Sequence, residues 1–395
     1  MRFFSRGVAA VVAALIPIGT LGAMGAGSAL AATGGPAGHP APAFSARTIL
    51  SGGNLSHTFS VSGKEHSEHL SSPDDITRLN GKLFVTFQNG VGPQGQASTS
   101  GNADSTIVEF TSAGHVVHQW DLHGKCDGLT ADPHGGVVIA TVNEDLNSSL
   151  YTIAPGARPA SQVQHYAYSK SPLPHNGGTD AISIYHGQIL ISASAPGTTG
   201  AAAPNATYPP VYQVTLHGRD HVATVQPLFY DEAAATVANS GSQTGKTVHL
   251  ALTDPDSNEV VPATAARFAG DFMLTSQGDK EQIFVRHAVS GHPQLSVLKL
   301  TQSVDDTAWP VSRHGALFAT SSATNTVIAV TGQFRPGTEF VAVTPCDASN
   351  APATCPAPPA FPANYLGTVN PSTGQVSAVT VHGAALQPQG MIFVS

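Results

Sequence analysis

Short apolar stretches recur along the chain, and many of them are introduced by an aspartate and separated by glycine-containing turns. In 127–142, Asp127 precedes one apolar stretch, two glycines form a turn, and a second apolar stretch follows. The same order of polar and apolar positions returns at Asp75, Asp180 and Asp306. Apolar stretches of about four to eight residues between turn residues indicate β-strands joined in hairpins. We therefore predict a chain of repeated antiparallel strands.

The pattern returns at a nearly constant interval and contains four predicted strands each time. The spacing is 52 residues from Asp75 to Asp127 and 53 residues from Asp127 to Asp180. In the second repeat, the predicted strands are 127–131, 136–142, 149–153 and 162–168. Four-stranded units that repeat without helices between them are the blades of β-propellers. The sequence therefore predicts an all-β fold, a β-propeller with six four-stranded blades.

The later repeats are less regular. Strands from the two ends of the chain are predicted to form one blade together. The fifth repeat is assigned the strands 316–320 and 326–331. The chain ends with 387–394, which has the pattern of the first strands of one more blade. We expect strands near 48–50 and 57–61 to complete this blade. Pairing of the first and last segments closes the ring and removes exposed sheet edges.

The first repeat carries a resemblance to a known group of propellers. It reads Pro-Asp-Asp-Ile at 73–76, Asn-Gly-Lys-Leu-Phe-Val-Thr at 80–86 and Ser-Thr-Ile-Val-Glu-Phe at 105–110. This pattern resembles NHL repeats and related six-bladed propellers, a group that includes gluconolactonases, regucalcin-like enzymes and secreted bacterial propellers. The resemblance extends over the chain from about Arg47 and implies the fold. The sequence lacks a recognisable set of the Glu and Asn residues that bind the metal in the lactonases.

The N-terminus has the pattern of a secretory signal. Two arginines and an apolar run precede Ala-Leu-Ala at 29–31, so residues 1–31 are predicted to be a signal peptide. Residues 32–46 are rich in Gly, Pro and Ala and are predicted to be a flexible leader, which leaves 47–395 for the propeller. No later stretch reaches the roughly 20 apolar residues of a membrane-spanning helix. We expect a secreted, monomeric protein whose partner is an extracellular ligand or protein.

Composition and cysteine content narrow the possible functions. The formal net charge of −8 offers no basic surface, so nucleic acid is not an expected partner. Cys346 and Cys355 enclose a short loop, and in an oxidising compartment they are predicted to form a disulfide bond. The remaining Cys126 has two interpretations. It is either a small buried apolar residue or a reactive thiolate or metal ligand.

The repeated aspartates are predicted to meet at one mouth of the central channel, because the innermost strand of each propeller blade lines that channel. The predicted ligand-binding residues are Asp75, Asp127, Asp180, Asp256 and Asp306, with Asp254 as an alternative in the fourth blade and Gln387 or Gln389 in the sixth. In a structural interpretation, each carboxylate accepts backbone N–H groups and fixes a turn. In a functional one, a hard cation such as Ca²⁺ joins carboxylates that otherwise repel each other. The predicted metal ligands are Asp127, Asp180, Asp254 and Asp256.

Catalysis is the less favoured hypothesis, and whether the protein is an enzyme is left open. His175 lies shortly before Asp180 and is a weak candidate for a general base, and Cys126 is a second weak candidate. The sequence contains no Gly-x-Ser-x-Gly elbow and no phosphate-binding Gly-Lys motif. The leading hypothesis is a secreted binding or interaction scaffold whose ligand face is the acidic channel mouth. The alternative is a calcium-assisted hydrolase of the lactonase or esterase type.

Overall fold

The computed structural model describes residues 44–194, 208–346 and 362–395. The chain divides into two compact units, Met1–Ala41 and Pro42–Ser395, and all described residues belong to the second unit. The regular elements of this part are β-strands and three short 3-10 helices, Gly52–Asn54, Pro159–Ser161 and Ser322–Thr324. None of the described helices is long and apolar enough to cross a membrane. The predicted all-β fold is confirmed.

Most strand pairs in the sheets are antiparallel, and many of them join consecutive strands. One sheet contains β4 (Pro73–Leu79), β5 (Lys82–Phe87), β6 (Asp104–Phe110) and β7 (Val116–His123) in this order. A larger sheet contains a run of β8 (Cys126–Asp132), β9 (Val137–Val142), β10 (Ser149–Ile153) and β11 (Val163–Tyr168). Its second run is β12 (Gly178–Tyr185), β13 (Gln188–Ser194), β14 (Val211–His217) and β15 (Val222–Phe229). Short parallel pairing of β11 with β15 joins the two runs.

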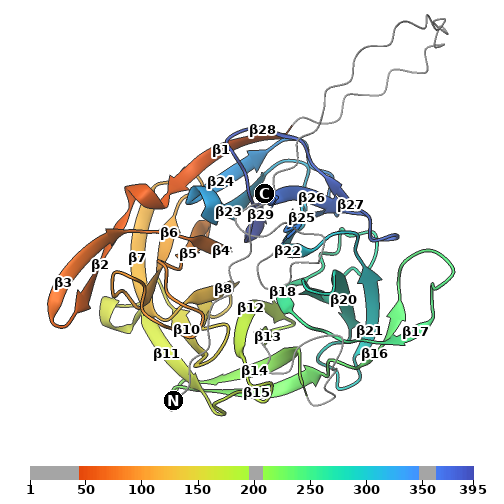
Figure 1. The fold of residues 1–395 in the computed structure, drawn as a ribbon, viewed down its shortest axis with the longest axis horizontal. Helices are drawn as coiled ribbons and strands as arrows, with labels where there is room; N and C mark the ends of the chain where they lie inside the picture. Colours follow the sequence, from red (N-terminus) through yellow and green to blue (C-terminus); the bar gives the residue numbers. More distant parts are fainter. Residues whose placement is uncertain (1–43, 195–207, 347–361) are drawn as a thin grey trace, which may run out of the picture. The chain divides into compact units, whose positions relative to one another are not determined.

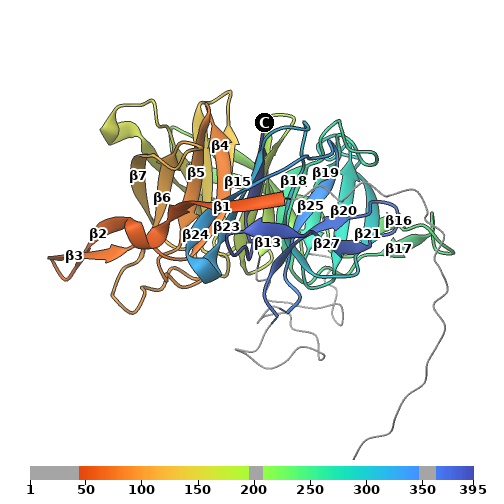
Figure 2. The ribbon, with the colours of Figure 1, turned by 90° about the horizontal axis from the view of Figure 1, so that it is seen from above.

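The next sheets follow the same plan with additions at the rim. One contains β18 (Pro255–Val260), β19 (Phe272–Ser276), β20 (Glu281–Arg286) and β21 (Gln294–Lys299), with β16 (Ala234–Val237) and β17 (Thr247–His249) at its outer edge. Another contains β22 (Val304–Ala308), β25 (Glu339–Val343), β26 (Tyr365–Val369) and β27 (Val376–Ala378). The separate hairpin of β2 (Ser56–Val61) and β3 (Lys64–His69) lies at the rim of the unit in Figures 1 and 2.

The last sheet joins the two ends of the described chain. Its order is β28 (Val381–Gly383), β1 (Phe44–Ser51), β24 (Thr326–Thr331), β23 (Ala316–Ser321) and β29 (Met391–Val394). The assignment of 316–331 to the fifth blade was therefore wrong. β23 pairs with β29, whereas β22 pairs with β25. The expectation that 57–61 joins the closing blade was also wrong, because β2 pairs only with β3 among the described strands. β1 begins at Phe44, within the predicted leader.

The innermost strands contact one another in a closed cycle. β4 contacts β8, β8 contacts β12, and the contacts continue through β18, β22 and β29 back to β4. Figure 1 shows these strands around the centre of the unit, with the later strands of each sheet farther out. The unit is therefore a β-propeller. The N-terminal strand β1 closes it by pairing with β24 and β28.

The apolar core lies between adjacent sheets. For example, Phe84 and Ile107 belong to the β4–β7 sheet, and they pack in one cluster with Leu129 and Val138 from β8 and β9. None of these four side chains is more than 3% exposed. Burial of apolar surface is the main favourable contribution to folding. This packing holds neighbouring innermost strands side by side and so positions the residues that face the channel.

Candidate functional site

A β-bulge that recurs in the innermost strands positions the residues of the channel mouth. In β4, the residues on either side of Asp74 and Asp75 pair with β5 residues that are separated by Thr86 alone. Two residues facing one form a β-bulge, which redirects side chains. The bulge residues of the described strands β4, β8, β12, β18 and β22 are Asp74 with Asp75, Asp127 with Gly128, Asp180 with Ala181, Asp256 with Ser257, and Asp305 with Asp306.

An aspartate occupies the first bulge position in each of these strands. The structural equivalents of Asp127 are Asp74 in β4 and Asp305 in β22. The alignment that used Asp75 and Asp306 was one residue out of register. The reason is that two aspartates stand side by side at both places, so the repeat pattern fits either of them.

Aspartates in the second bulge position tie neighbouring innermost strands together. The Asp75 carboxylate accepts hydrogen bonds of 2.6 Å from the backbone N–H of Ile76 and 2.6 Å from that of Leu129 on β8. Likewise, Asp306 accepts a hydrogen bond of 2.5 Å from the backbone N–H of Met391 on β29. Burial raises the pKa of Asp75 to about 7, although its two N–H donors lower it. Asp75 and Asp306 thus fit the structural interpretation, in which the carboxylate accepts backbone N–H groups.

A buried hydroxyl residue faces the bulge from the neighbouring strand, and sequence reasoning missed it. The Thr141 hydroxyl accepts from the backbone N–H of Gly128 at 2.8 Å and donates to the Asp180 carbonyl oxygen at 2.6 Å. Glycine is required at 128, because a Cβ there would lie 2.2 Å from that carbonyl oxygen. The residues that face the bulges of β4, β8, β12 and β18 are Thr86, Thr141, Ser192 and Thr275, each 0% exposed, whereas Ala342 faces the bulge of β22. The sequence signal that could have revealed this position is a Thr or Ser at one fixed place in the second, otherwise mostly apolar, strand of these blades.

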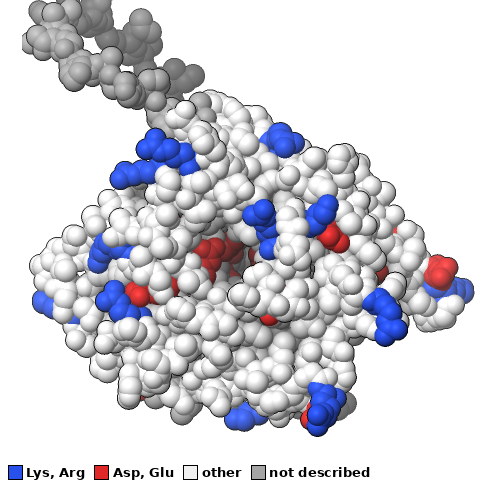
Figure 3. All heavy atoms as spheres, turned by 180° about the vertical axis from the view of Figure 1, so that it is seen from behind, with Lys and Arg blue, Asp and Glu red and all other residues white. Residues whose placement is uncertain are grey.

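The bulges surround a cavity of about 620 Å³. Its acidic lining residues are Asp74, Asp75, Asp127, Glu144, Asp180, Asp254, Asp256, Glu259, Asp305 and Asp306. Among the described residues that line it, Lys125 is the only Lys or Arg. In Figure 3, acidic residues gather in a hollow near the centre of the face, while most lysines and arginines lie farther out. The structure thus brings all five predicted ligand-binding aspartates, together with Gln389, to one cavity.

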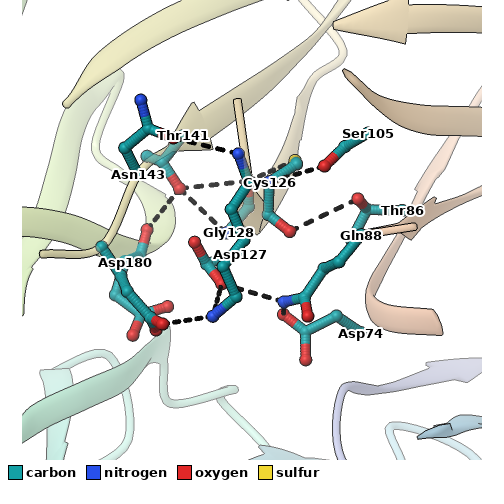
Figure 4. A network of polar contacts seen from close by, with 12 residues as sticks. Asp74, Thr86, Gln88, Ser105, Cys126, Asp127, Gly128, Thr141, Asn143 and Asp180 are labelled. Carbon is teal, nitrogen blue, oxygen red and sulfur yellow. Dashed lines mark hydrogen bonds and ion pairs between the residues drawn. The ribbon is translucent and has the colours of Figure 1, made fainter. Parts of the chain in front are cut away.

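One side of the cavity holds a network of polar contacts around Lys125. Its Nζ lies 2.8 Å from Oδ1 of Asp127 and forms a second ion pair with Glu144. Nε2 of Gln88 donates to Oδ1 of Asp127 and to Oδ2 of Asp74, both at 2.9 Å, as Figure 4 shows. Burial lowers the pKa of Lys125, but the charges of Asp127 and Glu144 outweigh burial and raise it overall. The ammonium group therefore stays charged.

Asp180 and Asp256 face a strongly negative environment. Burial raises the pKa of each carboxyl group well above its usual value, and neighbouring carboxylates raise it further. For Asp256, these neighbours include Asp180, Asp305 and Asp254. A carboxyl group whose charged form is disfavoured in this way either takes up a proton or gains a cation as a partner.

Three oxygen atoms of the lining are buried and have no hydrogen-bond partner among the described residues. They are Oδ2 of Asp127, Oγ of Ser257 and Oδ1 of Asn258. Their residues are 4%, 5% and 5% exposed. The side-chain nitrogen of Asn258 donates to the carbonyl oxygen of Ala181 at 2.7 Å, which orients the amide. Because buried polar atoms are normally hydrogen-bonded, these three mark places for a ligand or ordered water.

The two weak catalytic candidates are not among the described residues that line the cavity. Nδ1 of His175 lies 2.6 Å from the Tyr212 hydroxyl, and Nε2 lies 2.8 Å from the Gly178 carbonyl oxygen. Burial lowers the pKa of His175 to about 4, so its imidazole is a weak base at neutral pH. Cys126 is 0% exposed, and burial raises the pKa of its thiol well above the usual value. These surroundings favour structural roles for both residues.

The predicted disulfide bond falls at the border of the described residues. Cys346 lines the cavity, whereas Cys355 lies in 347–361, which the structure does not describe. The pairing of the two cysteines stays a prediction. Cys126 has a free thiol.

The predicted calcium ligands Asp127, Asp180, Asp254 and Asp256 all line the cavity. Their carboxylate oxygens are donors of the kind that Ca²⁺ prefers. In the described part of the chain, however, no group of three or more His, Cys, Asp or Glu side chains is arranged to hold a metal ion. The donor chemistry therefore suits calcium, while the arrangement distributes the donors around the cavity. The calcium site stays a prediction.

Comparisons with known proteins assign no family. No family model matches the chain, and no curated protein matches it. The periplasmic gluconolactonase of Pseudomonas aeruginosa aligns at 13% identity and a TM-score of 0.44 over 84% of this chain and 92% of that one. A protein of unknown function from Bacteroides caccae aligns at 8% identity and a TM-score of 0.42, with coverage of 84% and 92%.

A third similar structure is the hydrazine synthase of Kuenenia stuttgartiensis. It aligns at 10% identity and a TM-score of 0.39 over 79% of this chain, which spans 66% of the hydrazine synthase chain. The propeller assignment rests on the closed cycle of strand contacts.

Proposed function

We propose that this protein is a secreted binding scaffold, that its ligand site is the acidic channel mouth, and that its ligand is positively charged. The observation that supports this most directly is the cavity lining, with ten carboxyl groups and one lysine among the described residues. The volume of about 620 Å³ suits a small-molecule ligand, because such sites measure roughly 300–1,000 Å³. Secretion is inferred from the signal-like N-terminal sequence.

A positively charged ligand would reduce the electrostatic repulsion between the carboxylates of this lining. Burial raises the pKa of Asp74, Asp127, Asp180 and Asp256 well above the usual value, and neighbouring carboxylates add to the effect. Without a ligand, part of the lining therefore holds protons. A cation favours the ionised carboxylates and displaces these protons. Binding should then release protons and should weaken as the pH is lowered.

The hydrolase alternative finds less support in the same residues. The two catalytic groups predicted for it, His175 and Cys126, are not among the described residues that line the cavity. Burial also lowers the pKa of His175 to about 4 and raises that of the Cys126 thiol, so neither group is activated at neutral pH. We therefore propose binding rather than hydrolysis.

Stabilisation by cations tests the proposal. Thermal unfolding of the secreted protein is followed at pH 7 and constant ionic strength with CaCl₂, MgCl₂ or alkylamine salts. At least one of these cations should raise the unfolding midpoint by several degrees, because a ligand that binds the folded state stabilises it. Asp256→Asn should lose at least half of this shift.

The matched control is Asp220→Asn, which changes an exposed aspartate in the turn between β14 and β15. It should retain the full shift. If no cation stabilises the wild type more than Asp256→Asn, the proposal fails. Turnover of a lactone or ester by the wild type would instead support the hydrolase.

A further inference from the structure

We propose that the ligand carries at least two alkylammonium groups with N–H donors, as a linear polyamine does. This inference rests on the proposed function and names the ligand class for the same cavity. Three features separate this class from a single metal ion and from a quaternary ammonium compound. They are the distribution of the carboxyl groups, the buried acceptor atoms without partners, and the absence of aromatic residues from the described lining.

The carboxyl groups are spread around the cavity rather than gathered at one point. The first bulge positions lie on β4, β8, β12, β18 and β22, which follow one another around the ring. A calcium ion needs six to eight oxygens at about 2.3–2.6 Å, and no described group of three such side chains is arranged to hold a metal. The cavity of about 620 Å³ also leaves room for a ligand much larger than a single ion. Linked positive groups can reach carboxylates that lie apart.

The acceptors without partners call for hydrogen-bond donors. Oδ1 of Asn258 can only accept hydrogen bonds, and the same holds for Oδ2 of Asp127 when this carboxylate is ionised. Oγ of Ser257 can accept a hydrogen bond as well as donate one. All three atoms are buried in the lining without a partner among the described residues. An alkylammonium group brings two or three N–H donors and no acceptor. It therefore complements both the charge and the hydrogen-bonding capacity of this surface.

Lys125 shows how the lining holds an ammonium group. Its Nζ contacts Oδ1 of Asp127 at 2.8 Å and also pairs with Glu144. The side chain thus occupies one side of the cavity and partly neutralises it. Asp180 and Asp256, on the innermost strands β12 and β18, face a more negative environment. We expect one ammonium group of the ligand to bind between these two aspartates.

The described lining lacks the groups that hold quaternary ammonium ions. Such ions are bound by contact with the faces of Trp, Tyr or Phe rings. None of the described residues that line the cavity is aromatic. Carboxylate, amide and hydroxyl oxygens instead favour cations that donate hydrogen bonds. The cavity should therefore prefer amines with N–H groups over their fully methylated forms.

Calorimetric titrations with three probes test this ligand class. The secreted protein is titrated at pH 7 and constant ionic strength with spermine, with the permethylated quaternary form of spermine, and with CaCl₂. Spermine should bind with proton release, measured as a heat that depends on the ionisation enthalpy of the buffer. The quaternary form should bind at least tenfold more weakly. This comparison uses the wild type and so does not depend on how well any variant folds.

Variants locate the site. Asp180→Asn and Asp256→Asn should each weaken spermine binding about tenfold, and Ser257→Ala should weaken it less. The control Asp220→Asn should bind like the wild type. Equal affinity for spermine and its quaternary form would overturn the inference, as would unchanged affinity in both folded Asp→Asn variants. Saturable calcium binding without spermine binding would overturn it and leave the proposed cation site standing, whereas binding of no cation would overturn both.

Discussion

At the scale of single residues, the bulge gives different roles to two neighbouring aspartates. Asp74 holds the first position of the β4 bulge, and its carboxylate accepts a hydrogen bond from Gln88 at the cavity. Asp75 holds the second position and accepts the backbone N–H of Leu129 on the next innermost strand. A bulge bends the strand and re-aims its side chains, and here the two carboxylates meet different partners. One aspartate can therefore serve the ligand site while its neighbour joins two blades.

We expect Asp75→Ala to destabilise the fold far more than Asp74→Ala. Loss of the Asp75 carboxylate leaves the buried N–H of Leu129 without its acceptor, which costs about 1–3 kcal/mol. Asp74→Ala removes a neighbour that repels Asp127, and Gln88 keeps its bond to Asp127. Denaturant unfolding at pH 6 measures both variants. Similar losses of stability in the two variants would contradict the division of roles.

At the scale of elements, a buried histidine attaches the β2–β3 hairpin to the rim. Nδ1 of His57 lies 3.2 Å from Oδ1 of Asp121 on β7, and Nε2 lies 3.3 Å from Oε1 of Glu68 on β3. Thr106 donates to the same Asp121 oxygen at 2.6 Å. Burial lowers the pKa of His57, but the hydrogen bonds and charges of Asp121 and Glu68 raise it overall. A proton on His57 therefore strengthens the attachment.

The attachment of the hairpin should weaken as the pH rises. Because folding raises the pKa of His57 above its usual 6.5, its stabilisation is complete below 6.5 and is lost as the pH passes through the folded-state pKa. After correction for intrinsic rates, hydrogen exchange in β2 and β3 should be several-fold faster at pH 8 than at pH 6. His57→Gln should remove this pH dependence, whereas His66→Gln, at an exposed position of the same hairpin, should retain it. Persistence of the effect in His57→Gln would argue against the histidine.

At the scale of the whole molecule, the repeat was sufficient to predict a propeller, because each blade carries its own pattern of strands and turns. The partner of the β23–β24 hairpin could not be predicted, because β22 and β29 lie on either side of it in the chain. Only the pairing of β23 with β29 decides the question. The register of the bulges was equally ambiguous where two aspartates are adjacent, as at Asp74 and Asp75.

The sequence predicted the residues of the candidate site that recur from blade to blade, but not those that belong to a single blade. The aspartates could be found because they recur in blade after blade. Lys125 and Glu144 could not, since each lies beside a strand end in one blade. Gln88 was missed although Gln277 stands at the equivalent place, two residues after the buried threonine that faces the bulge, and also lines the cavity. They reach the cavity because the ring brings separate blades together. The contact between His57 and Asp121 also joins residues far apart in the sequence.

The ring as a whole should make the ligand-free protein less stable as the pH rises. Burial raises the pKa of Asp75 to about 7 and those of Asp180 and Asp256 well above 3.8. A carboxyl group with a raised pKa binds a proton more tightly in the folded state than in the unfolded chain. Its stabilising contribution is therefore complete below 3.8 and is lost as the pH rises through its folded-state pKa. For each pH unit between the unfolded-state and folded-state pKa of such a group that the pH change crosses, the free energy of unfolding falls by about 1.4 kcal/mol.

Denaturant unfolding between pH 5 and pH 8 measures this effect, with His57→Gln as the background so that the hairpin does not contribute. The free energy of unfolding should fall by at least about 1.4 kcal/mol across the range. Asp180→Asn with Asp256→Asn should flatten the profile, because neutral amides have no proton to lose. A saturating cationic ligand should flatten it as well, since it stabilises the ionised carboxylates. A free energy of unfolding that rises towards pH 8 in the ligand-free protein would contradict a ring of mutually repelling acids.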